Sequence, residues 1–199
     1  MITTDQIKQL RDATGISIMQ CRKALEASEG DHEKALFFLR KQGADVAEKK
    51  SERTLGAGVV AAYVHGGGAL GALVVLRCET DFVAKNPEFK ALAYDIAMHV
   101  AASSPDYVTF ADISEETKEH IRALFAEEVE KSSADKPADI KKRILDGKIM
   151  AYFKEKTLND QPFIKNPDID VHGIVQAGVQ KFGEKITIEK FVRLSAGGN

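Results

Sequence analysis

Residues 59–78 read VVAAYVHGGGALGALVVLRC, and this segment sets the class of fold. Two runs rich in β-forming residues, Val59 to Val64 and Leu70 to Cys78, flank a glycine triplet. Glycine adopts the positive φ angles of a tight hairpin turn without steric cost, so the segment predicts a β-hairpin. A phosphate-binding loop is the alternative, but such a loop would have to lead into a helix. These glycines lead into a second strand, which favours the hairpin.

The second strand is apolar on both of its faces. Successive side chains of a strand point to opposite faces, which places Leu73 and Val75 opposite a longer row made of Leu70, Ala72, Val74, Leu76 and Cys78. A strand of this kind is usually central or covered. Near the C-terminus, four apolar residues alternate as a final strand that can pair with the hairpin: Ile186, Ile188, Val192 and Leu194. We therefore expect an antiparallel three-stranded sheet.

Helices are expected between the hairpin and the final strand. The clearest has apolar residues at helical spacing and stops at Ser103-Ser104-Pro105; its apolar face consists of Phe89, Leu92, Ala93, Ile96, Ala97 and Val100. A helix behind Ser114, a longer or broken one behind Pro137 and a short one from Asp170 to Phe182 follow, with an irregular connection around Gln161 to Pro167. Helices on one side of an antiparallel sheet make an α+β domain.

The N-terminal segment predicts a small helical domain. Capping residues and glycines mark the ends of three short helices. The first helix is expected to run from Thr4 or Asp5 to Gly15, the second from Ser17 to Gly30, and the third from Asp31 to Gly43. Three such helices suit a bundle of the ubiquitin-associated type. Residues 45–53 lose the apolar period and suit a solvated linker or an exposed helical extension. We expect two domains, residues 1–53 and residues 54–199.

Composition narrows the classes of partner. The 199 residues contain 28 Lys and Arg against 30 Asp and Glu, for a net charge of −2, which argues against a broad basic surface for nucleic acid. The longest apolar run, Leu70 to Leu76, is too short to cross a bilayer, and the N-terminus lacks the features of a signal peptide. We expect a cytoplasmic protein whose partner is another protein or a small ligand, and neither nucleic acid nor a membrane.

Catalytic chemistry has no candidate in the sequence. The five histidines show no metal-ligand spacing, and the two cysteines, Cys21 and Cys78, suit buried positions better than a disulfide or a metal site. His99 lies beside the apolar stripe of the long helix, so we interpret it as a packing or interface residue. We expect no catalytic residue, no metal and no cofactor, hence not an enzyme, although an unrecognised hydrolase would need only a polar cluster that one sequence cannot display.

The segment Thr80-Asp81-Phe82-Val83 follows the second strand and precedes Pro87. Two interpretations are open. Phe82 is a core residue at a strand-to-helix junction with Asp81 as a cap, or Phe82 is exposed and can wedge into a partner, where burying it would contribute about 1.5–3 kcal/mol. Spacing alone favours the first interpretation.

Several motifs together resemble the elongation factor Ts family. They occur in the family's order along nearly the whole chain: Leu10-Arg11, Thr14-Gly15, Cys21-Arg22-Lys23-Ala24-Leu25, Gly30-Asp31, the diagnostic Cys78-Glu79-Thr80-Asp81-Phe82-Val83-Ala84-Lys85, Ile96-Ala97-Met98-His99-Val100-Ala101-Ala102 and Gln161-Pro162-Phe163. The resemblance implies a guanine-nucleotide exchange factor for elongation factor Tu in translation elongation. It also reverses the preference between the two interpretations of Phe82.

The resemblance implies roles for particular residues. Thr80, Asp81, Phe82 and Val83 would form the loop that intrudes beside the magnesium site of the GTPase and disturbs the metal, with Val83 supporting the loop from beneath. Residues that would dock the N-terminal bundle or the hairpin on the GTPase are Arg11, Ile18, Met19 and His65. The family often has methionine where this chain has Ile18, and an apolar anchor survives that change. On the residues alone, Met19 is as well explained as an ordinary surface methionine.

Chain length adds a further expectation. Longer family members carry two copies of the core module, whereas this chain offers one hairpin and one Thr-Asp-Phe-Val segment. We therefore hypothesise a homodimer or a two-plus-two complex with the GTPase, since cyclic symmetry is the usual way to close such an assembly. The alternative function is a ubiquitin-associated-like adaptor that binds proteins and has no exchange activity.

Overall fold

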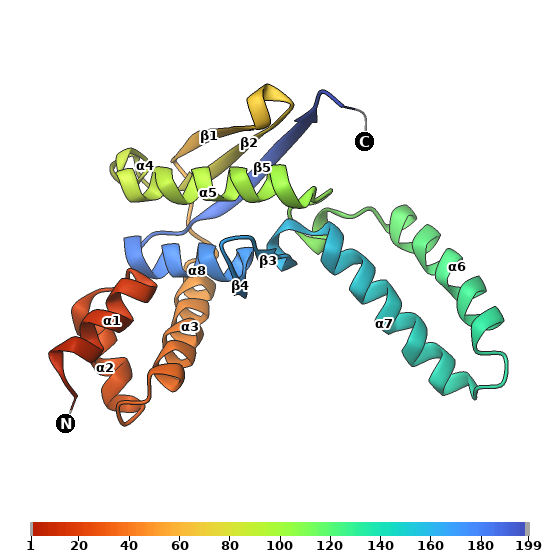
Figure 1. Ribbon diagram of the computed structural model, residues 1–199, viewed down its shortest axis with the longest axis horizontal. Helices are drawn as coiled ribbons and strands as arrows, with labels where there is room; N and C mark the ends of the chain where they lie inside the picture. The colour runs from red at the N-terminus through yellow and green to blue at the C-terminus, as the bar shows by residue number, and fades with distance from the viewer. Residues whose placement is uncertain (1, 198–199) are drawn as a thin grey trace.

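The computed structural model describes residues 2–197 and contains an antiparallel three-stranded sheet in the order β1-β2-β5 (Figure 1). Its strands are β1 (Ala57–His65), β2 (Leu70–Cys78) and β5 (Thr187–Ser195). β2 lies in the centre, as its two apolar faces predicted. The turn from β1 to β2 is a short 3-10 helix, Gly66–Gly68, whose three glycines all have positive φ. The α+β fold and the hairpin are thereby confirmed.

The final strand departs from regular alternation. Leu76 pairs with Ile188, but the neighbouring Val75 pairs with Lys190, so the ladder contains a bulge at Glu189. A bulge adds one residue to a strand and exchanges the faces of everything beyond it. The expectation that Ile186, Ile188, Val192 and Leu194 form one alternating row is therefore wrong past the bulge: Ile188 is buried, whereas Val192 and Leu194 are exposed on the opposite face.

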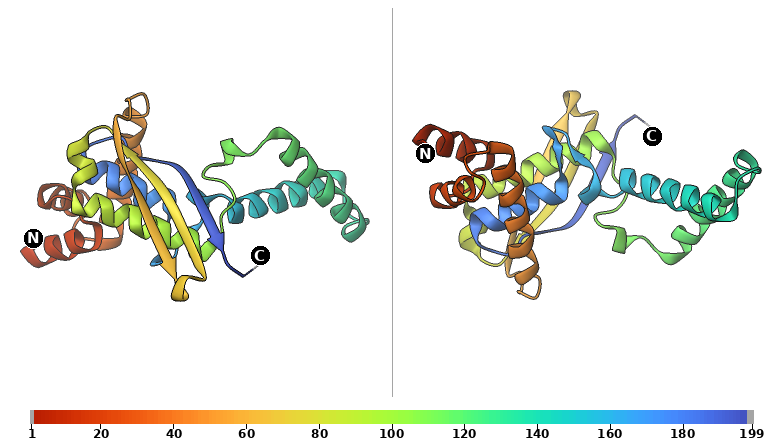
Figure 2. Two further views of the ribbon diagram at one scale, coloured as in Figure 1. Left: turned by 90° about the horizontal axis from the view of Figure 1, so that it is seen from above. Right: turned by 90° about the horizontal axis from the view of Figure 1, so that it is seen from below.

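Helix α5 (Pro87–Ser103) covers one face of the sheet, as Figures 1 and 2 show. Its predicted apolar stripe packs on the inward side chains of the strands, and its fully buried members include Phe89, Ala93, Ile96, Ala97 and Val100. Helix α8 (Val171–Phe182) lies on the same side and contributes Val171, Val175 and Val179 to this core. Within residues 2–197 no helix covers the other face of the sheet (Figure 2).

The N-terminal bundle consists of α1 (Thr4–Thr14), α2 (Ile18–Ala27) and α3 (His32–Lys49). Its separate small core is formed by Leu10, Ile16, Cys21, Ala24, Leu25, Ala35 and Leu39. Ser17 and Asp31 cap α2 and α3 as expected, and Gly15 ends α1 in the left-handed conformation. The expected cap of α1 at Thr4 or Asp5 is wrong by one or two positions, because Thr3 caps this helix.

The expected end of the third helix at Gly43 is wrong, because α3 continues to Lys49. Gly43 is buried against α8, where a Cβ atom would lie 3.3 Å from Oε1 of Gln180. The glycine thus permits the close approach of two helices. Val46 and Ala47 of the extension pack on the main core, so residues 45–49 are a half-buried helix and not a linker. Residues 51–53 form an exposed connection, as expected. The division into residues 1–53 and 54–199 stays a prediction.

A helical hairpin projects from the sheet domain (Figure 1). It pairs α6 (Glu115–Ser132) with an unbroken α7 (Ala138–Lys156), and ion pairs join the two helices at Arg122–Asp146, Lys141–Glu130 and Lys148–Glu128. Short 3-10 helices at Phe110–Asp112 and Leu158–Asp160 flank it. The connection expected to be irregular forms a small ladder between β3 (Pro162–Phe163) and β4 (Asn166–Asp170). No helix within residues 2–197 is long and apolar enough to cross a membrane.

His99 is a packing residue, as expected. It is fully buried on α5, where its Nδ1 accepts a hydrogen bond from the N–H of Ile164 (3.2 Å) and its Nε2 lies 2.9 Å from Oε1 of Gln161. These partners fix the neutral tautomer with the proton on Nε2. Burial holds the pKa of His99 below its ordinary value of 6.5.

The lowered pKa of His99 makes the stability of the fold dependent on pH. A depressed pKa stabilises the fold above the unfolded pKa, and this contribution is lost as the pH falls below about 6.5. Between pH 7 and 5, the free energy of unfolding in urea should therefore fall by up to about 1.4 kcal/mol per pH unit for one proton. A His99→Gln variant should lack this slope whatever its absolute stability. Equal slopes in the two proteins would contradict the assignment.

Candidate protein-docking site

The Thr80–Val83 segment lies at the junction between β2 and α5. The structure shows a short helix here, α4 (Asp81–Lys85), capped by Thr80, whose Oγ1 accepts a hydrogen bond from the N–H of Val83 (3.4 Å). Asn86 ends α4 and at once caps α5 by accepting from the N–H of Glu88 (2.8 Å). The connection is therefore an ordered elbow between a strand and a long helix.

The phase of α4 decides the orientation of Phe82. Val83 and Ala84 are buried in the main core. Each residue of a helix turns the side chain by about 100°, so the preceding residue points away, and Phe82 is 79% exposed. The interpretation of Phe82 as core is wrong, as is that of Asp81 as a cap, since the cap is Thr80. Val83 supports the segment from beneath.

Asp81 contributes an ionised carboxylate beside Phe82. Its Oδ2 lies 2.6 Å from Nζ of Lys85, one turn further along α4, and both side chains are about three-quarters exposed. The hydrogen bond from Lys85, together with the positive charge, holds the pKa of Asp81 below its usual value. Exposed ion pairs of this kind are weak, so a partner can replace Lys85 at little cost.

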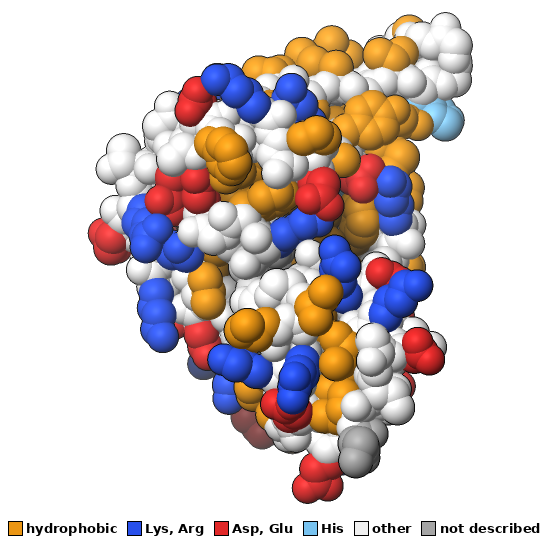
Figure 3. Space-filling view, turned by 90° about the vertical axis from the view of Figure 1, so that its left-hand side faces the viewer, with side chains coloured by type: hydrophobic (Ala, Val, Ile, Leu, Met, Phe, Trp, Pro, Cys, Tyr) orange, Lys and Arg blue, Asp and Glu red, His pale blue; other side chains and the backbone are white. Residues whose placement is uncertain are grey.

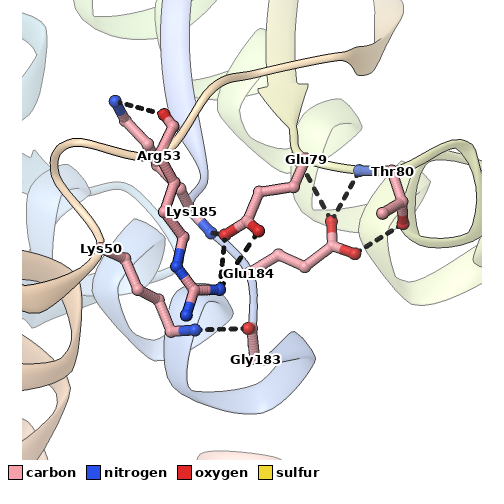
Figure 4. Close-up of polar contacts among 7 residues, drawn as sticks. All are labelled: Lys50, Arg53, Glu79, Thr80, Gly183, Glu184 and Lys185. Atoms are coloured by element: carbon pink, nitrogen blue, oxygen red, sulfur yellow. Dashed lines mark hydrogen bonds and ion pairs between the residues drawn. The ribbon is translucent and has the colours of Figure 1, made fainter.

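The elbow is anchored by a polar network that sequence reasoning missed (Figure 4). Glu184, in the turn between α8 and β5, accepts hydrogen bonds from the backbone N–H groups of Glu79 and Thr80. Glu79 in turn accepts from the N–H of Lys185 and from the guanidinium of Arg53. The partners are more than a hundred residues apart except for Arg53, and no local pattern in the sequence marks them.

The predicted bundle residues belong to one corner. Arg11 lies in the last turn of α1, and Ile18 and Met19 begin α2 directly after the Gly15–Ser17 turn. Arg11 is exposed, and Ile18 and Met19 are 56% and 69% exposed, which is high for large apolar side chains. Figure 3 views the end of the molecule that carries α4 and the bundle, where hydrophobic side chains appear as separate spots among charged ones. Single exposed apolar residues also occur on ordinary protein surfaces, so this exposure makes Ile18 and Met19 accessible to a partner and does not by itself mark an interface.

His65 does not join the Thr80–Val83 segment. In the hairpin, Ala57 pairs with Cys78 at the end next to α4, and His65 pairs with Leu70 at the opposite end. Nine-residue strands at about 3.4 Å per residue separate the two ends by about 27 Å. His65 is exposed, and its Nδ1 lies 2.8 Å from the hydroxyl of Tyr63. A partner that touches both would have to span the length of the sheet.

The described residues show little that could bind a metal or act as a nucleophile. Within residues 2–197 no three His, Cys, Asp or Glu side chains are grouped as a metal site requires. Cys21 and Cys78 are both buried, and burial raises the pKa of each thiol. What this end of the molecule offers is a rigid, exposed aromatic side chain, an adjacent carboxylate and a second set of apolar anchors, which suit binding to another protein.

Comparison with known proteins agrees with this description. Residues 38–198 match the family model described as Elongation factor TS, and residues 1–45 match that of a UBA-like domain, which accords with the bundle. Proteins named Elongation factor Ts are 45% identical in Carboxydothermus hydrogenoformans, over 99% of this chain and 90% of the relative, and 43% identical in Heliobacterium modesticaldum, over 99% and 91%. One from Thermodesulfovibrio yellowstonii is 41% identical over 98% of this chain and 96% of the relative. The chain belongs to the elongation factor Ts family.

Proposed function

We propose that this protein is a guanine-nucleotide exchange factor for elongation factor Tu in translation elongation. It binds the GDP-bound GTPase, promotes release of GDP and dissociates when GTP binds. Family membership supports the exchange activity, and the observation that carries the mechanism is the 79% exposure of Phe82 on an ordered elbow.

The mechanism follows from what Phe82 and Asp81 can do. Burying an exposed phenylalanine in a partner contributes about 1.5–3 kcal/mol, which can offset a local rearrangement there. We propose that this wedge enters beside the magnesium site of the GTPase. There the carboxylate of Asp81 would disturb the water molecules and side chains that surround the metal. Magnesium neutralises phosphate oxygens in such sites, so its loss weakens the hold on the diphosphate. By linkage, the factor and the nucleotide weaken each other's binding equally.

Exchange needs no catalytic residue of its own. No covalent bond forms or breaks when GDP leaves. The chain therefore has to supply binding free energy and a rigid shape, and exchange requires no acid, base, metal or cofactor from it. Arg11, Ile18 and Met19 give the bundle a docking corner that increases affinity, and His65 offers a separate contact at the far end of the hairpin.

The uncovered sheet face supports the hypothesis of a homodimer or two-plus-two complex. Large apolar side chains on this face are 44–67% exposed, and they come from all strands of the sheet: Val60, Val64, Leu73, Val192 and Leu194. Contiguous exposed apolar area of this kind usually marks an interface. A second copy carries the same face, so an isologous contact would cover both.

The first prediction from the proposed function concerns Phe82. Since its side chain is mostly exposed, Phe82→Ala should leave the free energy of unfolding within about 0.5 kcal/mol of the parent. Loss of the wedge should slow release of a fluorescent GDP from purified elongation factor Tu by about ten- to a hundredfold, because each tenfold corresponds to about 1.4 kcal/mol.

Met150→Ala is the matched control for Phe82→Ala. Met150 is 72% exposed on α7, in the hairpin that projects at the other end of the molecule, so its truncation should leave GDP release unchanged (Figure 1). If the parent protein does not accelerate GDP release at all, the proposed function is wrong. If the parent protein accelerates GDP release and Phe82→Ala is equally active, the wedge mechanism is wrong and the exchange activity stands.

The second prediction separates the exchange factor from the alternative, an adaptor. Deletion of residues 1–53 is unsuitable, since it would strip α3 from α8 and expose the main core. Met19→Lys instead places a charge at the docking corner and should raise the concentration needed for half-maximal GDP release about tenfold, with the maximal rate retained. Met150→Lys should change neither quantity. An adaptor would bind elongation factor Tu or another protein through the bundle without releasing nucleotide.

The third prediction concerns assembly. The parent protein should sediment as a dimer, and its complex with elongation factor Tu should contain two copies of each chain. Leu73→Lys places a charge on the central strand of the uncovered face and should give monomers with unchanged secondary structure. A parent protein that sediments as a monomer and forms a one-to-one complex at working concentrations would rule out the assembly.

A further inference from the structure

We infer that Glu184 is a positioning residue for the Thr80–Val83 segment: by holding the end of β2, it fixes the direction in which α4 presents Phe82. The inference deepens the proposed function and rests on it. The positioning role of Glu184 requires no contact with the partner. It acts on Thr80, the residue that caps α4 and lies two positions before Phe82.

The carboxylate of Glu184 meets three donors at the point where the strand stops. Its Oε2 accepts hydrogen bonds from the backbone N–H groups of Glu79 (3.1 Å) and Thr80 (3.0 Å), and its Oε1 accepts from the hydroxyl of Thr80 (2.5 Å). The paired ladder of β2 ends at Cys78, so these two N–H groups lie beyond it. Hydrogen bonds to an ionised acceptor are about twice as strong as neutral ones.

The hydroxyl of Thr80 passes this constraint on to α4. It has a single hydrogen, and the contact with Glu184 uses it, so its lone pairs are left to accept from the N–H of Val83. Glu184 thereby fixes the orientation in which the Thr80 hydroxyl caps α4. A helix of five residues is too short to be stable alone, and its orientation depends on this cap and on the burial of Val83 and Ala84.

A second carboxylate makes the anchoring reciprocal (Figure 4). Glu79 accepts from the N–H of Lys185 (2.5 Å), so each of the two segments holds the backbone of the other. Nη1 of Arg53 lies 3.2 and 3.3 Å from the two oxygens of Glu79, and Nζ of Lys185 donates to the carbonyls of Ser51 and Arg53. These contacts therefore fix three segments to one another next to the start of α4: the chain that leaves α3, the turn before β5 and the end of β2.

We call these contacts of Glu184 and Glu79 the clamp. The clamp predicts a specific kinetic effect. Docking through the bundle corner does not use the elbow, so the concentration for half-maximal GDP release should depend little on Glu184. Insertion of Phe82 into the partner, in contrast, requires that the Thr80–Val83 segment stay rigid. We therefore expect Glu184→Ala to lower the maximal rate of GDP release from elongation factor Tu about tenfold, with the half-maximal concentration changed by less than twofold.

Conservative variants and a control make the test sharp. Glu184→Gln keeps an oxygen for the two N–H groups but loses the charge and the second acceptor that meets the Thr80 hydroxyl, so it should restore only part of the rate. Glu184→Asp keeps the charge but is shorter by about 1.5 Å, so it should lose the rate as alanine does, and it serves if the alanine variant does not fold. Glu189→Ala removes an exposed glutamate of β5 whose ion pair with Arg77 (3.5 Å) is partly exposed and weak, so this variant should leave both parameters unchanged. Amide exchange at Glu79 and Thr80, followed by NMR, should accelerate in Glu184→Ala and not in Glu189→Ala.

The outcomes distinguish this inference from the proposed function. If Phe82→Ala loses exchange while Glu184→Ala and Glu184→Asp keep the full maximal rate, the positioning role is wrong and the exchange activity stands. If the Glu184 variants change only thermal stability, or only the half-maximal concentration, the positioning role is equally wrong. If the parent protein does not release GDP, the proposed function itself fails, while faster amide exchange in Glu184→Ala would still report the clamp.

Discussion

The packing of α5 on the sheet is the constraint on which the rest of the molecule depends. Its apolar stripe and the inward side chains of β1 and β2 form the main core, so β2 and α5 are fixed relative to each other. The chain between them has only eight residues, 79–86, and must close that gap. Val83 and Ala84 complete the core from inside the connection, which leaves Phe82 no direction other than solvent. The exposed aromatic side chain is therefore a consequence of the packing beneath it.

Much of this fold could be predicted because its signals are local. A glycine triplet between apolar runs specifies a hairpin, and capping residues mark where helices begin. The failures have a common cause in tertiary contact. A glycine such as Gly43 is typical of a helix end, but here the close approach of Gln180 explains why the position is a glycine. Likewise the bulge at Glu189 turns Val192 and Leu194 outward, and nothing in the alternation of the strand announces it.

The candidate site shows the same division. Motifs located Thr80 to Val83, but spacing alone favoured a buried Phe82, because the helical phase of a five-residue segment depends on which of its neighbours reach the core. Glu184 was beyond reach for a different reason. It contacts Thr80 across 104 positions of sequence, and a single glutamate after a glycine has no pattern that distinguishes it from a solvated one.

If the protein assembles through the open face of its sheet, as proposed, docking and assembly would use different surfaces and would not compete. α5, α8 and the bundle lie on one side, and α4 lies at the same end of the molecule as the bundle (Figure 1). The opposite face is free of helices within residues 2–197 and carries exposed valines and leucines. A second copy placed there would bury those side chains yet leave Phe82 and Met19 accessible. Since burial of that face would also restrain β2, from whose end α4 begins, assembly through the sheet would stiffen the support of the wedge and not obstruct it.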